Sequence, residues 1–167
     1  CCCPRRCGCL KPAASFGKTD CGEGATIQTL KWTYEVDGSD FTRAGEASSS
    51  VKKKLRKLGV SPDAIRKVSI ALYEGEINMV IHANGGRIDV EVAPDRIDMI
   101  LADQGKGIAD IDQAMQEGWS TAPDEVRSLG FGAGMGLPNM KKYSDEMRID
   151  STVGVGTTVY MTVYTGG

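Results

Sequence analysis

The sequence has no cysteine beyond position 21: its six cysteines stand at positions 1, 2, 3, 7, 9 and 21. A disulfide framework would be spread through the fold, so the chain is not a disulfide scaffold. The cysteine-rich segment has two interpretations, a metal or iron–sulfur site built from thiolates, or an unstructured leader. Because Cys1, Cys2 and Cys3 lack the spaced C-x-x-C pairs of common metal sites, we favour a leader over residues 1–25.

Long apolar runs and a strong net charge are also missing. No segment approaches the roughly 20 apolar residues of a membrane-spanning helix, and the N-terminus lacks the continuous apolar stretch of a secretory signal. The formal net charge is −2, which argues against a protein that binds nucleic acid through bulk positive charge. We therefore expect a cytoplasmic protein without a membrane or a direct nucleic-acid partner. The length of 167 residues allows one domain with one sizeable core, which we place at 26–167.

Regular apolar patterns occupy the rest of the chain. Alternating positions predict strands, and positions repeated every three to four residues predict helices. Ser61-Pro62-Asp63 marks one helix start, because it combines a capping hydroxyl, a proline in the first turn and an acid near the positive end of the helix dipole. We expect strands at about 30–36, 88–92, 97–101, 147–151 and 157–164, and helices at about 44–58, 62–83 and 137–144.

The order of these elements predicts the fold class. A turn-rich segment, residues 109–130, separates the third strand from the last helix and contains one short helical piece near 110–116; we call this segment the lid. Helices and strands in this order predict an α/β two-layer sandwich, in which helices cover one face of a mixed, mainly antiparallel sheet.

Three polar residues, Glu74, Asn78 and His82, stand four positions apart in the predicted helix 62–83. This spacing places them on one face, one turn above the other. The stripe either faces solvent or, if buried, needs partners. A carboxylate and an amide on one face also suit phosphate chemistry, since an amide oxygen can bind Mg²⁺ and a carboxylate can orient or deprotonate a hydroxyl.

Two glycine-containing segments follow. Asp103-Gln104-Gly105-Lys106-Gly107-Ile108 comes directly after a predicted strand, a pattern that also fits a plain strand-to-turn connection. Further on, Gly130, Gly132, Gly134 and Gly136 alternate with other residues before the helix from Leu137. Glycines at this spacing expose backbone amides to a polyphosphate, and a helix N-terminus beyond them adds a positive dipole end. A dinucleotide-binding G-x-G-x-x-G site is disfavoured, because it needs a strand immediately before the glycines.

Together, these three segments resemble the N-box, G1 box and G2 box of the GHKL ATPase superfamily, over about residues 27–165. The motifs Asp-Gln-Gly-Lys-Gly-Ile, Glu-Gly-Trp-Ser-Thr and Gly-Ala-Gly-Met-Gly-Leu-Pro-Asn-Met-Lys are most similar to the anti-sigma-factor and switch serine/threonine kinases of bacteria. Glu76, an extra acid inside the N-box, and the cysteine-rich segment depart from the family pattern.

The resemblance implies the fold of this superfamily, the Bergerat ATP-binding fold, with ATP and Mg²⁺ as cofactors. It implies Glu74 as catalytic base, Asn78 as the Mg²⁺ ligand, and Asp103 as acceptor for the adenine amino group. His82 is expected to be structural rather than a phosphoacceptor. The remaining nucleotide-binding positions that the resemblance implies are Gly105, Gly107, Ile108, Gly132, Gly134, Gly136, Leu137 and Thr157.

Three functions stay open at this point. The first is a serine/threonine kinase that phosphorylates a STAS-type anti-sigma-factor antagonist, with a sigma factor as a further candidate partner. The second is a module that uses ATP only to set its affinity for a partner. The third is the catalytic fragment of a sensor histidine kinase, which needs an upstream phosphorylatable His; no His precedes Glu74, so this interpretation fails if the chain is complete. Members of the family often dimerise, and a homodimer is kept as an open alternative.

Overall fold

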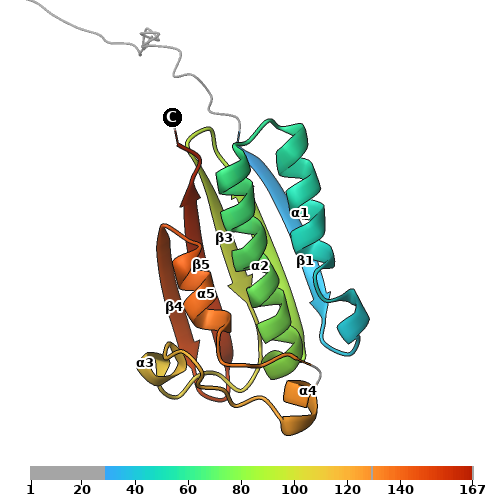
Figure 1. The fold of residues 1–167 in the computed structure, drawn as a ribbon, viewed down its shortest axis with the longest axis vertical. Coiled ribbons are helices and arrows are strands. Elements are labelled where there is room, and N and C mark those ends of the chain that lie inside the picture. Colours follow the sequence, from blue (N-terminus) through green and yellow to red (C-terminus); the bar gives the residue numbers. More distant parts are fainter. Residues whose placement is uncertain (1–28, 129, 167) are drawn as a thin grey trace, which may run out of the picture.

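The computed structural model describes residues 29–128 and 130–166; the predicted leader and all six cysteines lie outside this range. The described chain forms one five-stranded sheet in the order β1-β2-β3-β5-β4. Helices α1, α2 and α5 cover one face of this sheet, and α3 and α4 lie at one end of it (Figure 1). The strands are β1 (Leu30–Asp37), β2 (Gly85–Val92), β3 (Arg96–Ala102), β4 (Glu146–Thr152) and β5 (Gly156–Tyr164). The helical segments are η1 (Phe41–Arg43), α1 (Glu46–Lys57), α2 (Pro62–Ala83), α3 (Ile111–Ala114), α4 (Asp124–Ser128) and α5 (Gly136–Lys142).

All four pairings in this sheet are antiparallel. The predicted two-layer α/β sandwich is therefore confirmed, and the sheet is antiparallel throughout rather than mixed. β3 and β4 point the same way, since each is antiparallel to β5. They are not neighbours, however, because β5 inserts between them. The crossover through the lid and α5 thus produces no parallel pair.

Helix α2 is the central element of the helical layer. It begins at the expected cap, where the Ser61 hydroxyl accepts the backbone N–H of Ala64. It ends at Asn84, whose φ of 59° places it in the left-handed region, a conformation that Asn tolerates better than most residues. At Gly75 the helix lies directly against β3: a Cβ there would come within 2.0 Å of the Leu101 side chain. This close approach fixes how far the neighbouring N-box side chains stand from the sheet.

The core fills the space between the helical layer and the sheet. Its fully buried members come from α1, α2, α5 and the inward positions of β2, β3 and β5. The largest are Leu55, Leu72, Ile88, Ile97, Met99, Leu101, Met140 and Met161. None of the helices within residues 29–128 and 130–166 has the length and apolar character that crossing a bilayer requires.

One local feature differs from the sequence-based expectations. Helix α4 was not predicted: Pro123, Asp124 and Glu125 form a helix start, but five residues are too few to show periodicity.

Candidate functional site

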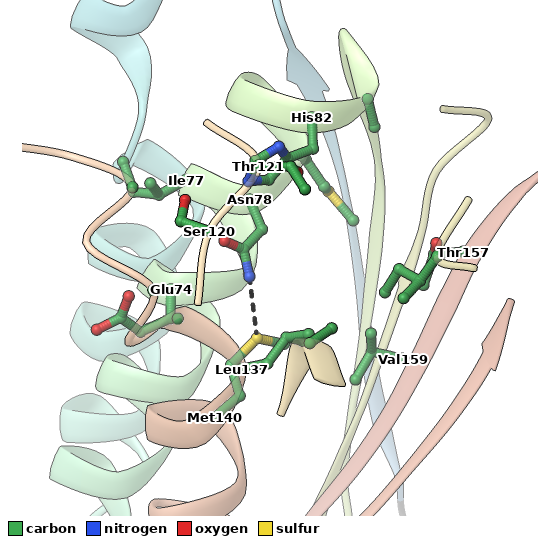
Figure 2. A pocket seen from close by; sticks show the side chains of 18 of the residues that line it. Glu74, Ile77, Asn78, His82, Ser120, Thr121, Leu137, Met140, Thr157 and Val159 are labelled. Atoms are coloured by element: carbon green, nitrogen blue, oxygen red, sulfur yellow. Dashed lines mark hydrogen bonds between the residues drawn. The ribbon is translucent and has the colours of Figure 1, made fainter. Parts of the chain in front are cut away.

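One cavity of about 720 Å³ opens between α2, the sheet and the lid. Its walls come from α2, from the loop after β3, from the lid, from the start of α5 and from β5. Figure 2 shows the polar side chains of α2 on one side, and Thr157 and Val159 of β5 on another. The volume is in the range of sites that hold a small organic ligand.

Glu74 and Asn78 line this cavity from α2, and both contact α5. The Asn139 side-chain amide donates to a Glu74 carboxylate oxygen over 2.8 Å. The Asn78 amide nitrogen lies 3.6 Å from the Met140 sulfur (Figure 2). Its oxygen lies beside Gly136, where a Cβ would stand 2.7 Å from Oδ1. Only glycine fits at this point without pushing the Asn78 side chain aside, so the start of the glycine-rich helix is adapted to the N-box.

Asp103 sits at the end of β3 in a network that joins the loop to β5. Its Oδ1 accepts the backbone N–H groups of Gly105 at 2.8 Å and Thr157 at 3.1 Å. The Thr157 hydroxyl lies 2.8 Å from the hydroxyl of Ser151 in β4, and the Ser151 oxygen also accepts the backbone N–H of Ile108 at 2.8 Å. Asp103 and Thr157 were predicted to lie at one site, whereas Ser151, 43 residues from Ile108 in the chain, was not predicted there.

The remaining predicted positions divide into two groups. Gly107, Ile108, Gly132, Gly134, Gly136 and Leu137 line the cavity together with Glu74, Asn78, Asp103 and Thr157. Gly105 does not line it. It packs against the end of α2, where a Cβ would come within 2.6 Å of the Cβ of Ala83. The individual roles of all these residues toward a ligand stay predictions.

Glu76, the extra acid in the N-box, points to another part of the molecule. Its side chain is only 2% exposed, and its carboxylate accepts the backbone N–H groups of Gly45, Ala47 and Ser48 at 3.1, 3.0 and 2.9 Å. These are the free amides of the first turn of α1, whose N-cap residue is a glycine without a capping side chain. Glu76 therefore supplies the N-cap of α1 from α2, a contact that sequence spacing does not reveal.

His82 and Lys106 both line the cavity. Burial lowers the pKa of His82 below its ordinary value of 6.5, the positive charge of Lys106 lowers it further, and Asp103 opposes both. His82 is therefore neutral at pH 7. The Lys106 ammonium donates to the Thr121 hydroxyl of the lid over 3.3 Å.

This fold and this cavity define the class of the protein, a two-layer α/β domain with a ligand cavity between its helical layer, its sheet and a lid. The described residues contain no cluster of three or more His, Cys, Asp or Glu side chains suited to hold a metal ion. A family model, the histidine kinase-like ATPase domain, matches residues 39–163. The chain thus belongs to the histidine kinase-like ATPase family.

Individual relatives agree with this assignment and confirm the resemblance to the anti-sigma and switch-kinase branch. The chain is 35% identical over 145 residues to an anti-sigma F factor of Caldanaerobacter subterraneus subsp. tengcongensis, covering 84% of this chain and 94% of the relative. It is 32% identical over 124 residues to the serine/threonine-protein kinase RsbT of Bacillus subtilis, covering 72% and 85% of the two chains.

A solved structure supports the fold. The crystal structure of the RsbU and RsbW domains of a Mycobacterium tuberculosis protein superimposes with a TM-score of 0.56, at 17% identity, over 80% of this chain. This chain spans about a third of that one, 32% of its length.

Proposed function

We propose that this protein is an ATP-dependent serine/threonine kinase that phosphorylates a STAS-type anti-sigma-factor antagonist. The observation that carries the proposal is the cavity itself, in which Glu74 and Asn78 of one helix face meet the glycine-rich start of α5 and, further along, Asp103 and Thr157. The relatives named as anti-sigma factors and as a serine/threonine kinase support this choice of reaction and partner. A sigma factor, a cytoplasmic location and a homodimer belong to the same proposal.

The residues present fit a nucleotide bound with Mg²⁺. The Asn78 amide nitrogen faces Met140, so its oxygen is the atom directed elsewhere, and oxygen is the ligand that Mg²⁺ prefers. The Asp103 carboxylate has one oxygen engaged by two backbone N–H groups, and its second oxygen suits the exocyclic amino group of adenine. When bound, Mg²⁺ supplies charge neutralisation to the phosphates.

In this proposal Glu74 takes the proton of the acceptor hydroxyl. As the hydroxyl oxygen forms a bond to the γ-phosphorus, the bond between that phosphorus and the bridging oxygen of the β-phosphate breaks, and ADP leaves. Glu74 contributes as a general base and by orienting the hydroxyl. The Asn139 amide, 2.8 Å from a Glu74 oxygen, holds the carboxylate in place.

The same Asn139 contact favours a second candidate, a non-catalytic module that uses ATP to set its affinity for a partner. In that function Glu74 only anchors α5 to α2. A carboxylate that is already hydrogen-bonded serves such an anchor without any proton transfer.

Glu74→Gln separates the two candidates. The amide keeps an oxygen that can accept from Asn139, so the α5 contact survives, but it cannot take a proton. We expect ATP affinity to be retained and transfer of labelled phosphate to a STAS partner to be lost, with an acid-stable phosphoester formed by the wild type. Asn139→Ala should retain part of the transfer activity. If the wild type phosphorylates no partner and Glu74→Gln still represses a sigma factor fully, the non-catalytic module is the correct function.

A further inference from the structure

The charge of the cavity wall is unbalanced toward acid. Glu74, Asp103 and Asp110 all line it. Among the described residues that line it, Lys106 is the one side chain with a permanent positive charge, since His82 is neutral at pH 7. A polyphosphate entering this space meets three carboxylates, whose repulsion is substantial where solvent screening is reduced. Such a ligand needs a cation, and the wall offers Lys106.

The backbone of Lys106 is held firmly. Its carbonyl oxygen accepts the Gly154 N–H of the β4–β5 turn at 2.9 Å. Two positions later, the Ile108 N–H donates to Ser151 in β4. On the other side, Gly105 packs against Ala83 of α2. The loop thus presents the lysine from a fixed base, and only the four-carbon side chain is free to move.

The side chain itself reaches across the cavity to the lid. Its ammonium is hydrogen-bonded to the Thr121 hydroxyl over 3.3 Å in an exposed position. The Thr121 hydroxyl is neutral, whereas a phosphate oxygen carries negative charge, so a phosphate adds the Coulomb attraction of an ion pair to the hydrogen bond. The ammonium can therefore leave Thr121 for an anion in the cavity at little cost.

We propose that Lys106 is the phosphate-recognising cation of this site, and that its ammonium exchanges the Thr121 hydroxyl for an oxygen of the nucleotide's phosphate chain. This inference rests on the proposed nucleotide binding and is independent of phosphoryl transfer. It adds a residue outside the glycine-rich segment to phosphate recognition. In this proposal, the contact with Thr121 of the lid holds the Lys106 side chain over the cavity before the nucleotide binds.

The test compares ligands that differ only in their phosphates. Adenosine, ADP and ATP are titrated by calorimetry into the wild type and into Lys106→Met, which keeps an unbranched side chain one atom shorter and removes the charge. We expect the affinity for ADP and ATP to fall by about tenfold or more, as for a lost hydrogen bond to a charged group, and the affinity for adenosine to stay the same. Lys106→Arg should restore most of the lost affinity.

Lys53→Met is the matched control, since Lys53 is an exposed lysine of α1 that does not line the cavity. It should bind all three ligands like the wild type. An equal loss of adenosine and ATP affinity in Lys106→Met, or no loss of either, would overturn the role of Lys106. A wild type that gains no affinity from the phosphates would overturn it as well. A wild type that binds ATP through Lys106 but transfers no phosphate would contradict the kinase function alone.

Discussion

Asp103 has one carboxylate oxygen committed to the protein, where it accepts the N–H groups of Gly105 and Thr157. Asp103→Asn keeps that oxygen and replaces the other by an amino group. We expect the free energy of unfolding to change little and ATP binding to weaken by roughly 1.5–3 kcal/mol, about tenfold to a hundredfold in affinity. Calorimetry and denaturation measure the two effects. Equal ATP affinity in the variant would remove Asp103 from the site.

GTP should bind worse than ATP, because its six-position oxygen would face the carboxylate.

His82 should make stability depend on pH. Its pKa in the folded protein is lowered below 6.5 by burial and by Lys106. As the pH falls below 6.5, the unfolded chain therefore binds a proton at His82 more readily than the folded protein does. The free energy of unfolding is highest, as far as His82 is concerned, above pH 6.5 and decreases below it. His82→Gln should show a smaller decrease between about pH 7.5 and about pH 5.5 in urea denaturation. The same decrease in both proteins would show that other groups cause it.

Among single residues, the sequence allows prediction of those site residues that stand out by their local spacing. Glu74 and Asn78 stand one helical turn apart, and Asp103 ends an alternating strand, so both features are visible without a structure. Ser151, Asn139 and the target of Glu76 were missed for one reason. Each makes a contact with a residue at least 28 positions away, and nothing in the local pattern indicates the partner.

Among the elements, α1 depends on a cap that α2 provides. Glu76→Gln leaves one acceptor oxygen for the three backbone N–H groups of Gly45, Ala47 and Ser48. The new side-chain NH₂ would point at one or more of these N–H donors in a buried position. We expect a loss of about 1–3 kcal/mol in the free energy of unfolding, measured by chemical denaturation. Hydrogen exchange should be faster at these three amides than elsewhere in the helical layer.

Glu46→Gln is the control for this prediction. Glu46 lies in the first turn of the same helix but pairs with Arg43 on the surface, at side-chain exposures of 61% and 57%. Exposed pairs contribute little to stability. A destabilisation of equal size in both variants would mean that the effect comes from negative charge near the helix terminus and not from the buried cap.

The lid is the element that we expect to respond to nucleotide. Its two helices, α3 and α4, have four and five residues, and among the lid residues that the structure describes, Ala114 and Ala122 are the buried apolar side chains. Segments with so few apolar anchors open at low cost. Hydrogen exchange in 109–130 should slow on adding ATP and Mg²⁺, whereas unchanged exchange would contradict a lid function.

The order of the helices and strands was predictable because apolar periodicity sets it, but α4 is too short to show a period.

For the whole molecule, we predict that residues 1–25 are dispensable for folding and ATP binding. The regular apolar pattern starts only near Ile27, and the family match begins at residue 39. A deletion variant that starts at Ala25 should unfold at the same denaturant concentration as the full chain and bind ATP equally well. A variant that fails to fold, or stoichiometric metal in the purified full chain, would show that the cysteine-rich segment is part of the functional protein.

Among the described residues, all those that line the cavity fall between Tyr73 and Val159, and β1, η1 and α1 contribute none. The exposed side chains of α1 can therefore change without replacing any residue of the cavity wall. The Glu76 cap binds α1 through its backbone amides and so does not constrain the exposed side chains of that helix. The inward residues of α1, such as Val51 and Leu55, remain constrained by the core. Ligand recognition and the outer surface of the first helix are free to diverge at different rates, and descendants of one ancestor can acquire new surfaces while inheriting an unchanged pocket.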